Sequence, residues 1–169
     1  LSRADKLTIS VTAIGRIVSR PLLRSAAKPG DRIYVSRPLG GSSAGFALLG
    51  KDAAAYVHRE FIESAIRRHV DPEPELALGL ALAHIDEVTS CIDVSDGLST
   101  DLHHLCDASN CGAEIDKERI PVFPDLQAFA GKLGINVRDA VLNGGEEYAL
   151  LFTSSLPEPQ MSQRAGRPV

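Results

Sequence analysis

The chain has 169 residues, of which 44% are apolar and 24% are charged, and its formal net charge at pH 7 is -4; these values indicate one globular domain with a proper core. The negative charge, the lack of a basic run and the absence of tryptophan argue against a nucleic-acid partner. The apolar stretches are too short for a membrane span. The three cysteines form no C-x-x-C pair, which predicts a reduced, cytoplasmic protein.

The first half of the chain predicts two strands followed by three helices. β-Branched residues and partial alternation indicate the strands, whereas apolar residues at helical spacing indicate the helices. Prolines and glycines mark the ends of these segments. The predicted elements are strands over 7–18 and 32–36 and helices over 44–49, 56–70 and 75–85.

Two connections in this half carry polar residues. Lys28 is interpreted as a solvated residue of the loop between the two strands, but Arg24, flanked by leucines and a serine, does not fit that interpretation well. The turn 38–45 leads from strand to helix as phosphate loops do, yet it lacks the G-x-x-x-x-G-K-[ST] pattern. Close packing of small residues is therefore favoured there, with Ser42 or Ser43 as the helix cap.

The candidate site is the stretch 91–98, Cys-Ile-Asp-Val-Ser-Asp-Gly-Leu, which reads as the end of a buried strand, a tight turn and the start of a helix. Alternate side chains of an extended segment share a face. Asp93 and Ser95 are therefore expected to project together, whereas Ile92 and Val94 face the core.

Asp96 and Gly97 then lie at the start of the helix. A glycine lets a ligand approach the backbone, and free amides at a helix start attract phosphate. Two carboxylates beside such amides suit a Mg²⁺ ion that bridges to nucleotide phosphates. The alternative is that Asp96 or Ser95 caps the helix and Asp93 closes the turn. For the whole Asp-x-Ser-Asp-Gly unit, the phosphate and metal interpretation is preferred.

The second half of the chain predicts a further alternation of strands and helices, which is typical of a layered α/β architecture. Glu146 and Glu147 begin the last predicted strand behind two glycines. They either contact the polar group of a ligand or stay solvated, and the residues alone leave both open. No helix or strand is predicted in the polar tail from Ser154. The predicted elements are strands over 89–94, 113–116 and 146–153 and helices over 98–108, 126–133 and 137–142.

Five motifs lie at residues 11–15, 23–31, 39–45, 92–98 and 144–148. In order and spacing they resemble the thiamine-monophosphate kinase family, whose superfamily includes aminoimidazole ribonucleotide synthetase and selenophosphate synthetase. The resemblance implies an α/β (α+β) fold, a three-layer mixed sheet flanked by helices. It also implies transfer of a phosphoryl group from ATP to thiamine monophosphate with Mg²⁺. The Gly-Gly-Glu segment favours the kinase over other members of the superfamily.

The resemblance also assigns roles to single residues. Asp93 and Asp96 resemble Mg²⁺ ligands, Ser95 and Arg24 resemble nucleotide contacts, and Glu146 resembles the residue that holds thiamine monophosphate. The alternatives are another ATP-dependent synthetase of the superfamily and a non-catalytic dimerising module.

The family's subunit has two domains, and its active site lies between them at a dimer. We therefore expect residues 1–19 to be a strand that enters from a missing N-terminal domain. Residues 20–169 would be a C-terminal α/β domain, truncated at its C-terminal end, of a protein that is a homodimer at full length. Two carboxylates alone should hold Mg-ATP poorly, so this chain is expected to be inactive by itself. Its departures from the family pattern are Ala26, Glu75, Glu147 and Ala149.

Overall fold

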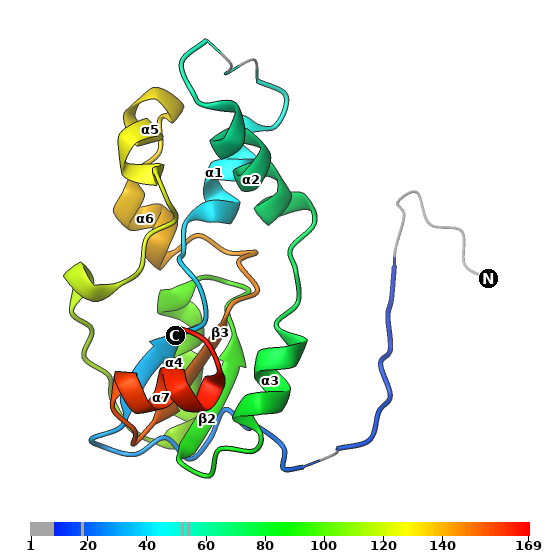
Figure 1. The fold of residues 1–169 in the computed structure, drawn as a ribbon, viewed down its shortest axis with the longest axis vertical. Coiled ribbons are helices and arrows are strands. Elements are labelled where there is room, and N and C mark those ends of the chain that lie inside the picture. Colours follow the sequence, from blue (N-terminus) through cyan, green and yellow to red (C-terminus); the bar gives the residue numbers. More distant parts are fainter. Residues whose placement is uncertain (1–8, 18, 52, 54) are drawn as a thin grey trace.

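The computed structural model describes residues 9–17, 19–51, 53 and 55–169, and its elements alternate along the chain much as predicted (Figure 1). The strands of this part are β1 (Arg32–Val35), β2 (Val88–Asp93) and β3 (Leu150–Ser154). The helices are α1 (Gly41–Leu48), α2 (Arg59–Val70), α3 (Leu76–Leu82), α4 (Leu98–Ser109), α5 (Leu126–Leu133), α6 (Val137–Leu142) and α7 (Glu158–Ala165), with a 3₁₀ turn at Lys117–Arg119.

The three described strands form one sheet in the order β1-β3-β2, with both pairings antiparallel. Phe152 of β3 lies opposite Tyr34 of β1 and Cys91 of β2. Within the described residues, parallel pairing is limited to an isolated bridge between Leu39 and Val122. The α+β class is confirmed, but the sheet of this part is antiparallel rather than mixed.

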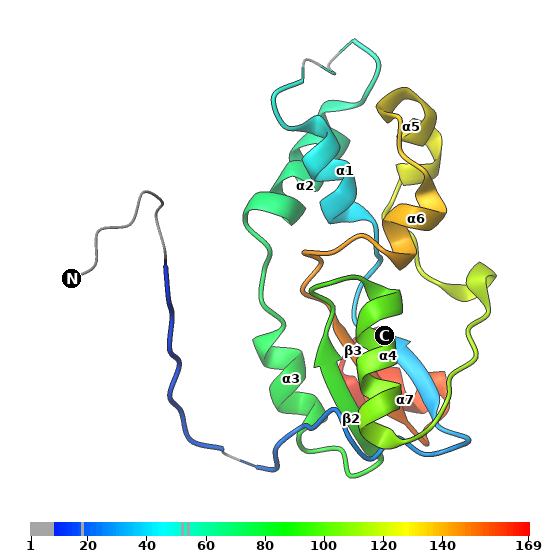
Figure 2. The ribbon, with the colours of Figure 1, turned by 180° about the vertical axis from the view of Figure 1, so that it is seen from behind.

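Helices cover both faces of the sheet, which confirms the three-layer arrangement. Helices α3 and α7 lie over one face, where Leu82 and Met161 pack with Phe152. Helix α4 lies over the other face, as Figure 2 shows from behind, and contributes Leu102 and Leu105 to a core with Leu151. Burial of one such Leu, Met or Phe side chain stabilises the fold by roughly 2 kcal/mol.

A second group of helices, α1, α2, α5 and α6, stands at one end of the sheet (Figure 1). Its core is built on Phe61, Phe123, Leu126 and Phe129, which are all buried. This group carries the loop between α6 and β3 and thereby positions one half of the candidate site. None of the helices in the described part of the chain combines the length and the apolar character that crossing a membrane requires.

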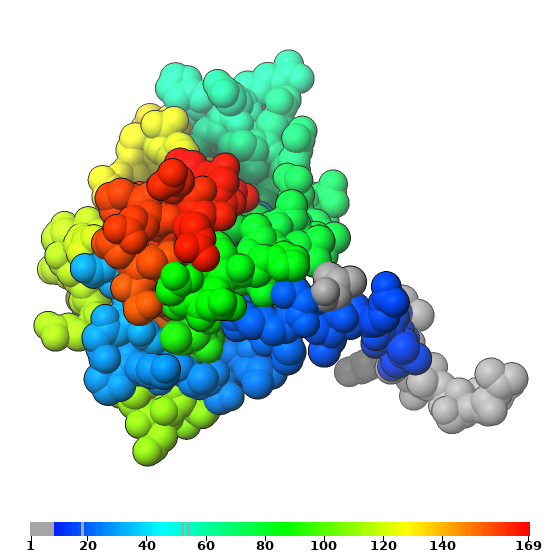
Figure 3. Space-filling view, turned by 60° about the horizontal axis from the view of Figure 1, so that its bottom comes forward, coloured from blue at the N-terminus to red at the C-terminus, as the bar shows by residue number. Residues whose placement is uncertain are grey.

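The strand predicted over 7–18 is not observed in its described residues 9–17; residues 7, 8 and 18 lie outside the described part. Residues 9–17 have no assigned secondary structure and project from the body of the molecule (Figure 3). Ile9, Val11, Ile14 and Ile17 are between 64% and 95% exposed. β-Branched residues favour a strand only where a neighbouring strand supplies hydrogen bonds, and this segment has none within the described chain.

Two other predictions at the C-terminal side are wrong. Residues 113–116 are exposed and form no strand. The polar tail contains helix α7, which begins after Pro157 and carries the fully buried Met161 on its inner face. Prolines favour the first turn of a helix, where no amide hydrogen bond is lost. Pro157 and Pro159 accordingly lie at the start of α7 and do not interrupt it.

Candidate functional site

The turn Asp93–Gly97 joins the end of β2 to the start of α4. Ile92 and Val94 are 7% and 0% exposed, whereas the side chain of Asp93 is exposed and that of Ser95 is half-buried. The predicted directions of Ile92, Asp93 and Val94 are therefore confirmed, whereas Ser95 lies in a bend beyond the end of β2. Asp96 is exposed, and neither it nor Asp93 takes part in an ion pair with any described residue.

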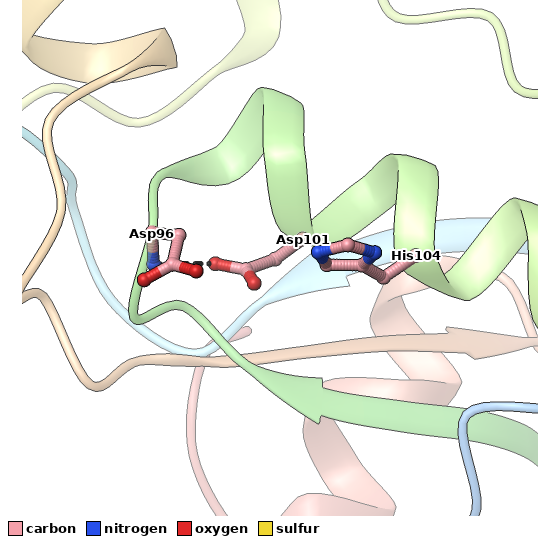
Figure 4. A group of neighbouring side chains, drawn as sticks. All are labelled: Asp96, Asp101 and His104. Atoms are coloured by element: carbon pink, nitrogen blue, oxygen red, sulfur yellow. Dashed lines mark hydrogen bonds between the residues drawn. The ribbon is translucent and has the colours of Figure 1, made fainter.

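Asp101 organises this turn from inside. Its side chain is 2% exposed, and its Oδ2 atom accepts a hydrogen bond from the Ser95 amide at 2.9 Å. The same atom accepts from the Asp96 amide at 3.0 Å (Figure 4). These two amides, which precede the helix, are consequently not free for a phosphate. The residue at the N-cap is Gly97, and no side chain caps the helix. The alternative role of Asp96 or Ser95 as the cap is therefore wrong.

Sequence reasoning misses Asp101 because no local pattern shows that it folds back onto the turn; an acidic residue near a helix start is the only signal. Asp101 forms a group with Asp96 and His104, in which one ligand atom from each lies within 4.8 Å of the others (Figure 4). Asp96 and His104 are the exposed members of this group. Its carboxylates suit a hard cation, whereas an imidazole nitrogen suits softer metals.

The segment between α6 and β3 lies directly against the turn. The Glu146 amide donates to the Ser95 carbonyl, and the Tyr148 amide donates to the Val94 carbonyl, both at 2.8 Å. A Cβ atom at Gly145 would come within 2.6 Å of the Ser95 carbonyl oxygen. A glycine is therefore required for this close approach. The structure thus brings Glu146 together with the residues of the Asp93–Gly97 turn.

Residues 146–149 do not extend the strand, contrary to the prediction that it begins at Glu146. Glu146 and Tyr148 have positive φ values of 61° and 48°. The Tyr148 hydroxyl donates to Glu146 Oε2 at 2.6 Å. The pKa of Tyr148 is raised by this hydrogen bond first, then by partial burial and by the negative charges of Glu146, Asp93 and Asp96. These three carboxylates therefore act on one phenol.

Glu147 points the other way and is fully buried. Its Oε1 atom accepts hydrogen bonds from the amides of Gly40 at 2.8 Å and Ser42 at 3.0 Å, and its Oε2 atom lies 3.7 Å from Arg68 Nε. Burial raises the pKa of this carboxyl, and the Ser42 amide and Arg68 offset the effect only in part. The amides of the glycine-serine turn are thus occupied by an internal carboxylate, which agrees with the packing interpretation of that turn. Gly40, not Ser42 or Ser43, occupies the N-cap position of α1.

Arg24 lies beside β2, because the Leu23 carbonyl accepts a hydrogen bond from the Cys91 amide at 2.8 Å. Its own carbonyl accepts from the Ser109 hydroxyl at 3.1 Å, at the end of α4. The Arg24 side chain is exposed and forms no ion pair with the described residues of the turn.

Ala26, in the same loop, has a φ of 93°. A Cβ atom in this region is strained, so Ala26→Gly is expected to stabilise the chain by about 1 kcal/mol despite the greater freedom of glycine in the unfolded state. Urea unfolding followed by circular dichroism measures the difference. Ala27→Gly is the matched control, since Ala27 is buried and has no positive φ, and it should destabilise. A loss of stability in Ala26→Gly contradicts the prediction.

Comparison with known proteins gives a consistent result. Residues 28–155 match the family described as AIR synthase related protein, C-terminal domain. The thiamine-monophosphate kinase of Bacillus subtilis (strain 168) is 36% identical over 159 residues, covering 94% of this chain and 47% of that protein. The thiamine-monophosphate kinase of Escherichia coli (strain K12) is 42% identical over 136 residues, covering 80% of this chain and 40% of that protein.

Among solved structures, that of AaThiL complexed with AMPPCP and TMP matches with a TM-score of 0.70 and 31% identity, covering 85% of this chain and 43% of that one. The chain therefore spans about half the length of the curated relatives that it matches.

Proposed function

The chain belongs to the family of AIR synthase related proteins, C-terminal domain, and on that premise we propose that it is part of a kinase that transfers a phosphoryl group from ATP to thiamine monophosphate. The observation that carries the proposal is the pair of hydrogen bonds from the Glu146 and Tyr148 amides to the carbonyls of Ser95 and Val94. Through them the carboxylates proposed for the metal and for the substrate share one end of the sheet. Phosphoryl transfer depends mainly on such positioning and on charge neutralisation.

Mg²⁺ is proposed to be held by Asp93 and Asp96, whose carboxylates are exposed and free of ion pairs with the described residues. Such a donor set fits Mg²⁺, which takes one or two protein carboxylates and completes its shell with water and phosphate oxygens. When bound, the ion would neutralise charge on the nucleotide phosphates. Asp101 supports this set by fixing the Ser95 and Asp96 amides and with them the backbone that carries the Asp96 side chain.

The remaining roles belong to the chain's polar side chains. The half-buried Ser95 hydroxyl and the exposed Arg24 guanidinium are proposed to contact ATP, since both groups donate hydrogen bonds to phosphate oxygens. Glu146 is proposed to hold thiamine monophosphate, because a carboxylate complements the positively charged ring of thiamine. The hydrogen bond from Tyr148 would fix the orientation of that carboxylate.

Catalysis is proposed to need more than this chain. Two carboxylates offer few ligands for a metal-nucleotide complex, and the relatives are about twice as long as the matched region. We therefore propose a further domain and a homodimer in the full-length protein, and no turnover by this chain alone. A reducing compartment such as the cytoplasm suits its three free cysteines.

Calorimetric titration of Mg-ATP into the chain tests the nucleotide site. We expect weak, saturable binding that falls at least about tenfold in the variant Asp93→Asn, Asp96→Asn, because two charge-assisted metal contacts are lost. Chelation of Mg²⁺ should have the same effect on the unmodified chain. Asp107→Asn, an exposed residue at the other end of α4, is the matched control and should bind as the unmodified chain does.

Equal and negligible binding by the unmodified chain and the double variant would contradict a nucleotide site here and support a non-catalytic module. The chain could instead bind Mg-ATP specifically while the full-length protein acts on an acceptor other than thiamine monophosphate. That result would support a different ATP-dependent enzyme of the superfamily.

A further inference from the structure

We infer that Glu147 is a positioning residue, whose buried carboxylate is anchored on the first amides of α1 and thereby holds Glu146 and Tyr148 in the backbone conformation that presents them to the site. The inference rests on the proposed function only where it gives Glu146 a role toward substrate. The backbone effect itself can be tested without any ligand.

The anchor is a charged group bound at a helix start. Glu147 Oε1 accepts from the Gly40 and Ser42 amides, which lie at the N-terminal end of α1 and have no partner inside the helix. The partial positive charge of this end favours a carboxylate, and hydrogen bonds to an ionised acceptor are the stronger kind. The carboxylate is therefore fixed against a different part of the fold, more than a hundred residues away in the chain.

The residues on each side of the anchor have unusual backbone conformations. Glu146 and Tyr148 have φ values of 61° and 48°, in the left-handed region that non-glycine residues rarely adopt. Such conformations persist only where the surroundings impose them. The two amides are fixed by the carbonyls of Ser95 and Val94, and between them the Glu147 side chain is fixed by α1. The three contacts together direct the neighbouring side chains outward.

A buried apolar side chain would not substitute for this arrangement. It would avoid the desolvation of the carboxylate, but it would leave the Gly40 and Ser42 amides buried without an acceptor. Arg68 contributes a compensating charge, with its Nε atom 3.7 Å from Glu147 Oε2. The polar anchor therefore selects one placement of the loop on α1, which an apolar contact would not.

The test uses Glu147→Leu, which removes the acceptor at similar volume, and Glu147→Gln, which keeps a carbonyl acceptor. Hydrogen exchange measured by NMR should show the Glu146 and Tyr148 amides of the Leu variant exchanging at least about tenfold faster relative to the amide of Phe152 in β3. The ring-carbon shifts of Tyr148 should show its pKa falling toward the ordinary tyrosine value, since the contact with Glu146 loosens. Glu147→Gln should keep most of the slow exchange of these two amides and most of the raised pKa of Tyr148 that the unmodified chain shows.

Unchanged exchange and an unchanged Tyr148 pKa in Glu147→Leu would overturn the inference, and so would a Gln variant no better than the Leu variant. If the Leu variant does not fold, Glu147→Asp can replace it, because its side chain is one methylene shorter and draws the carboxylate away from α1. Hydrogen exchange at the Glu146 and Tyr148 amides should then be faster, and unaltered exchange rates would also overturn the inference. Titration of thiamine monophosphate is a separate arm. A chain that binds none of it contradicts the proposed role of Glu146 but leaves the exchange result for Glu147 intact.

Discussion

Gly45→Ala is expected to destabilise the chain by about 3 kcal/mol, because there is no room for a methyl group between α1 and α2. A Cβ atom at Gly45 would lie 2.1 Å from the Ala65 carbonyl oxygen and 2.8 Å from the His69 Cβ atom. The nearest atom belongs to the backbone of α2, so the collision can be relieved only by moving the whole helix. Because Phe61 of α2 packs against Phe123 and Phe129, moving this helix should also separate Phe61 from these two rings.

Urea unfolding of the variant and of the unmodified chain measures this loss. Gly131→Ala is the matched control: Gly131 lies within α5, and a methyl group there would meet no atom within 4 Å outside its immediate neighbourhood. Because alanine is the better helix former, this control should gain up to about 1 kcal/mol. If both alanine variants unfold at the same urea concentration, the close contact between α1 and α2 does not exist in solution.

Glu75→Gln is expected to cost about 2 kcal/mol at neutral pH, because Glu75 pairs with two arginines from distant segments. Its Oε1 atom accepts from Arg37 Nε at 2.6 Å, and its Oε2 atom accepts from Arg167 Nη1 at 2.9 Å. The Glu75 side chain is 6% exposed and that of Arg37 is 11% exposed. Removing the negative charge would leave the Arg37 guanidinium nearly buried without its counter-charge.

The same contact predicts a pH dependence. Burial tends to raise the pKa of Glu75, but hydrogen bonds and charge from Arg167 and Arg37 outweigh it and lower the pKa below the ordinary value of 4.5. A carboxyl whose pKa is lowered by folding stabilises the fold above its ordinary pKa and loses this contribution as the pH falls through the folded value. The difference in unfolding free energy between the unmodified chain and Glu75→Gln should therefore be largest near pH 7 and shrink below pH 4.5. Glu73→Gln, an exposed neighbour, should show no such pattern.

Much of the fold can be predicted because its signals are local. Apolar residues at helical spacing indicate α2, α4 and α5 within a few residues of their observed ends, and short β-branched or apolar runs indicate the strands of the sheet. The failures involve partners that are distant in the chain. A strand needs a neighbour, which residues 9–17 do not have among the described residues, and α7 is stabilised by burial of Met161 rather than by its own composition.

The candidate site divides in the same way. The outward direction of Asp93 and the inward direction of Val94 follow from the two-residue period of a strand, so they can be predicted. The occupation of the α1 amides by Glu147 depends on a contact between distant parts of the chain, which no local pattern records. The turn amides are occupied by Asp101, which is only five and six residues away, but no known motif marks this contact. Glu75 is a further example: the sequence shows it only as a departure from the family pattern, whereas the structure pairs it with two arginines from distant segments.

The order of the strands has a consequence for biosynthesis. The central strand β3 is the last of the three to be translated. Strands β1 and β2 therefore leave the ribosome before the strand with which each of them pairs. Pairing over such long stretches of chain is entropically costly and slow. We expect the sheet to assemble only once β3 has emerged, and Glu146 to meet the Asp93–Gly97 turn in the same event. A nascent chain arrested before residue 150 would carry every proposed ligand and no assembled site.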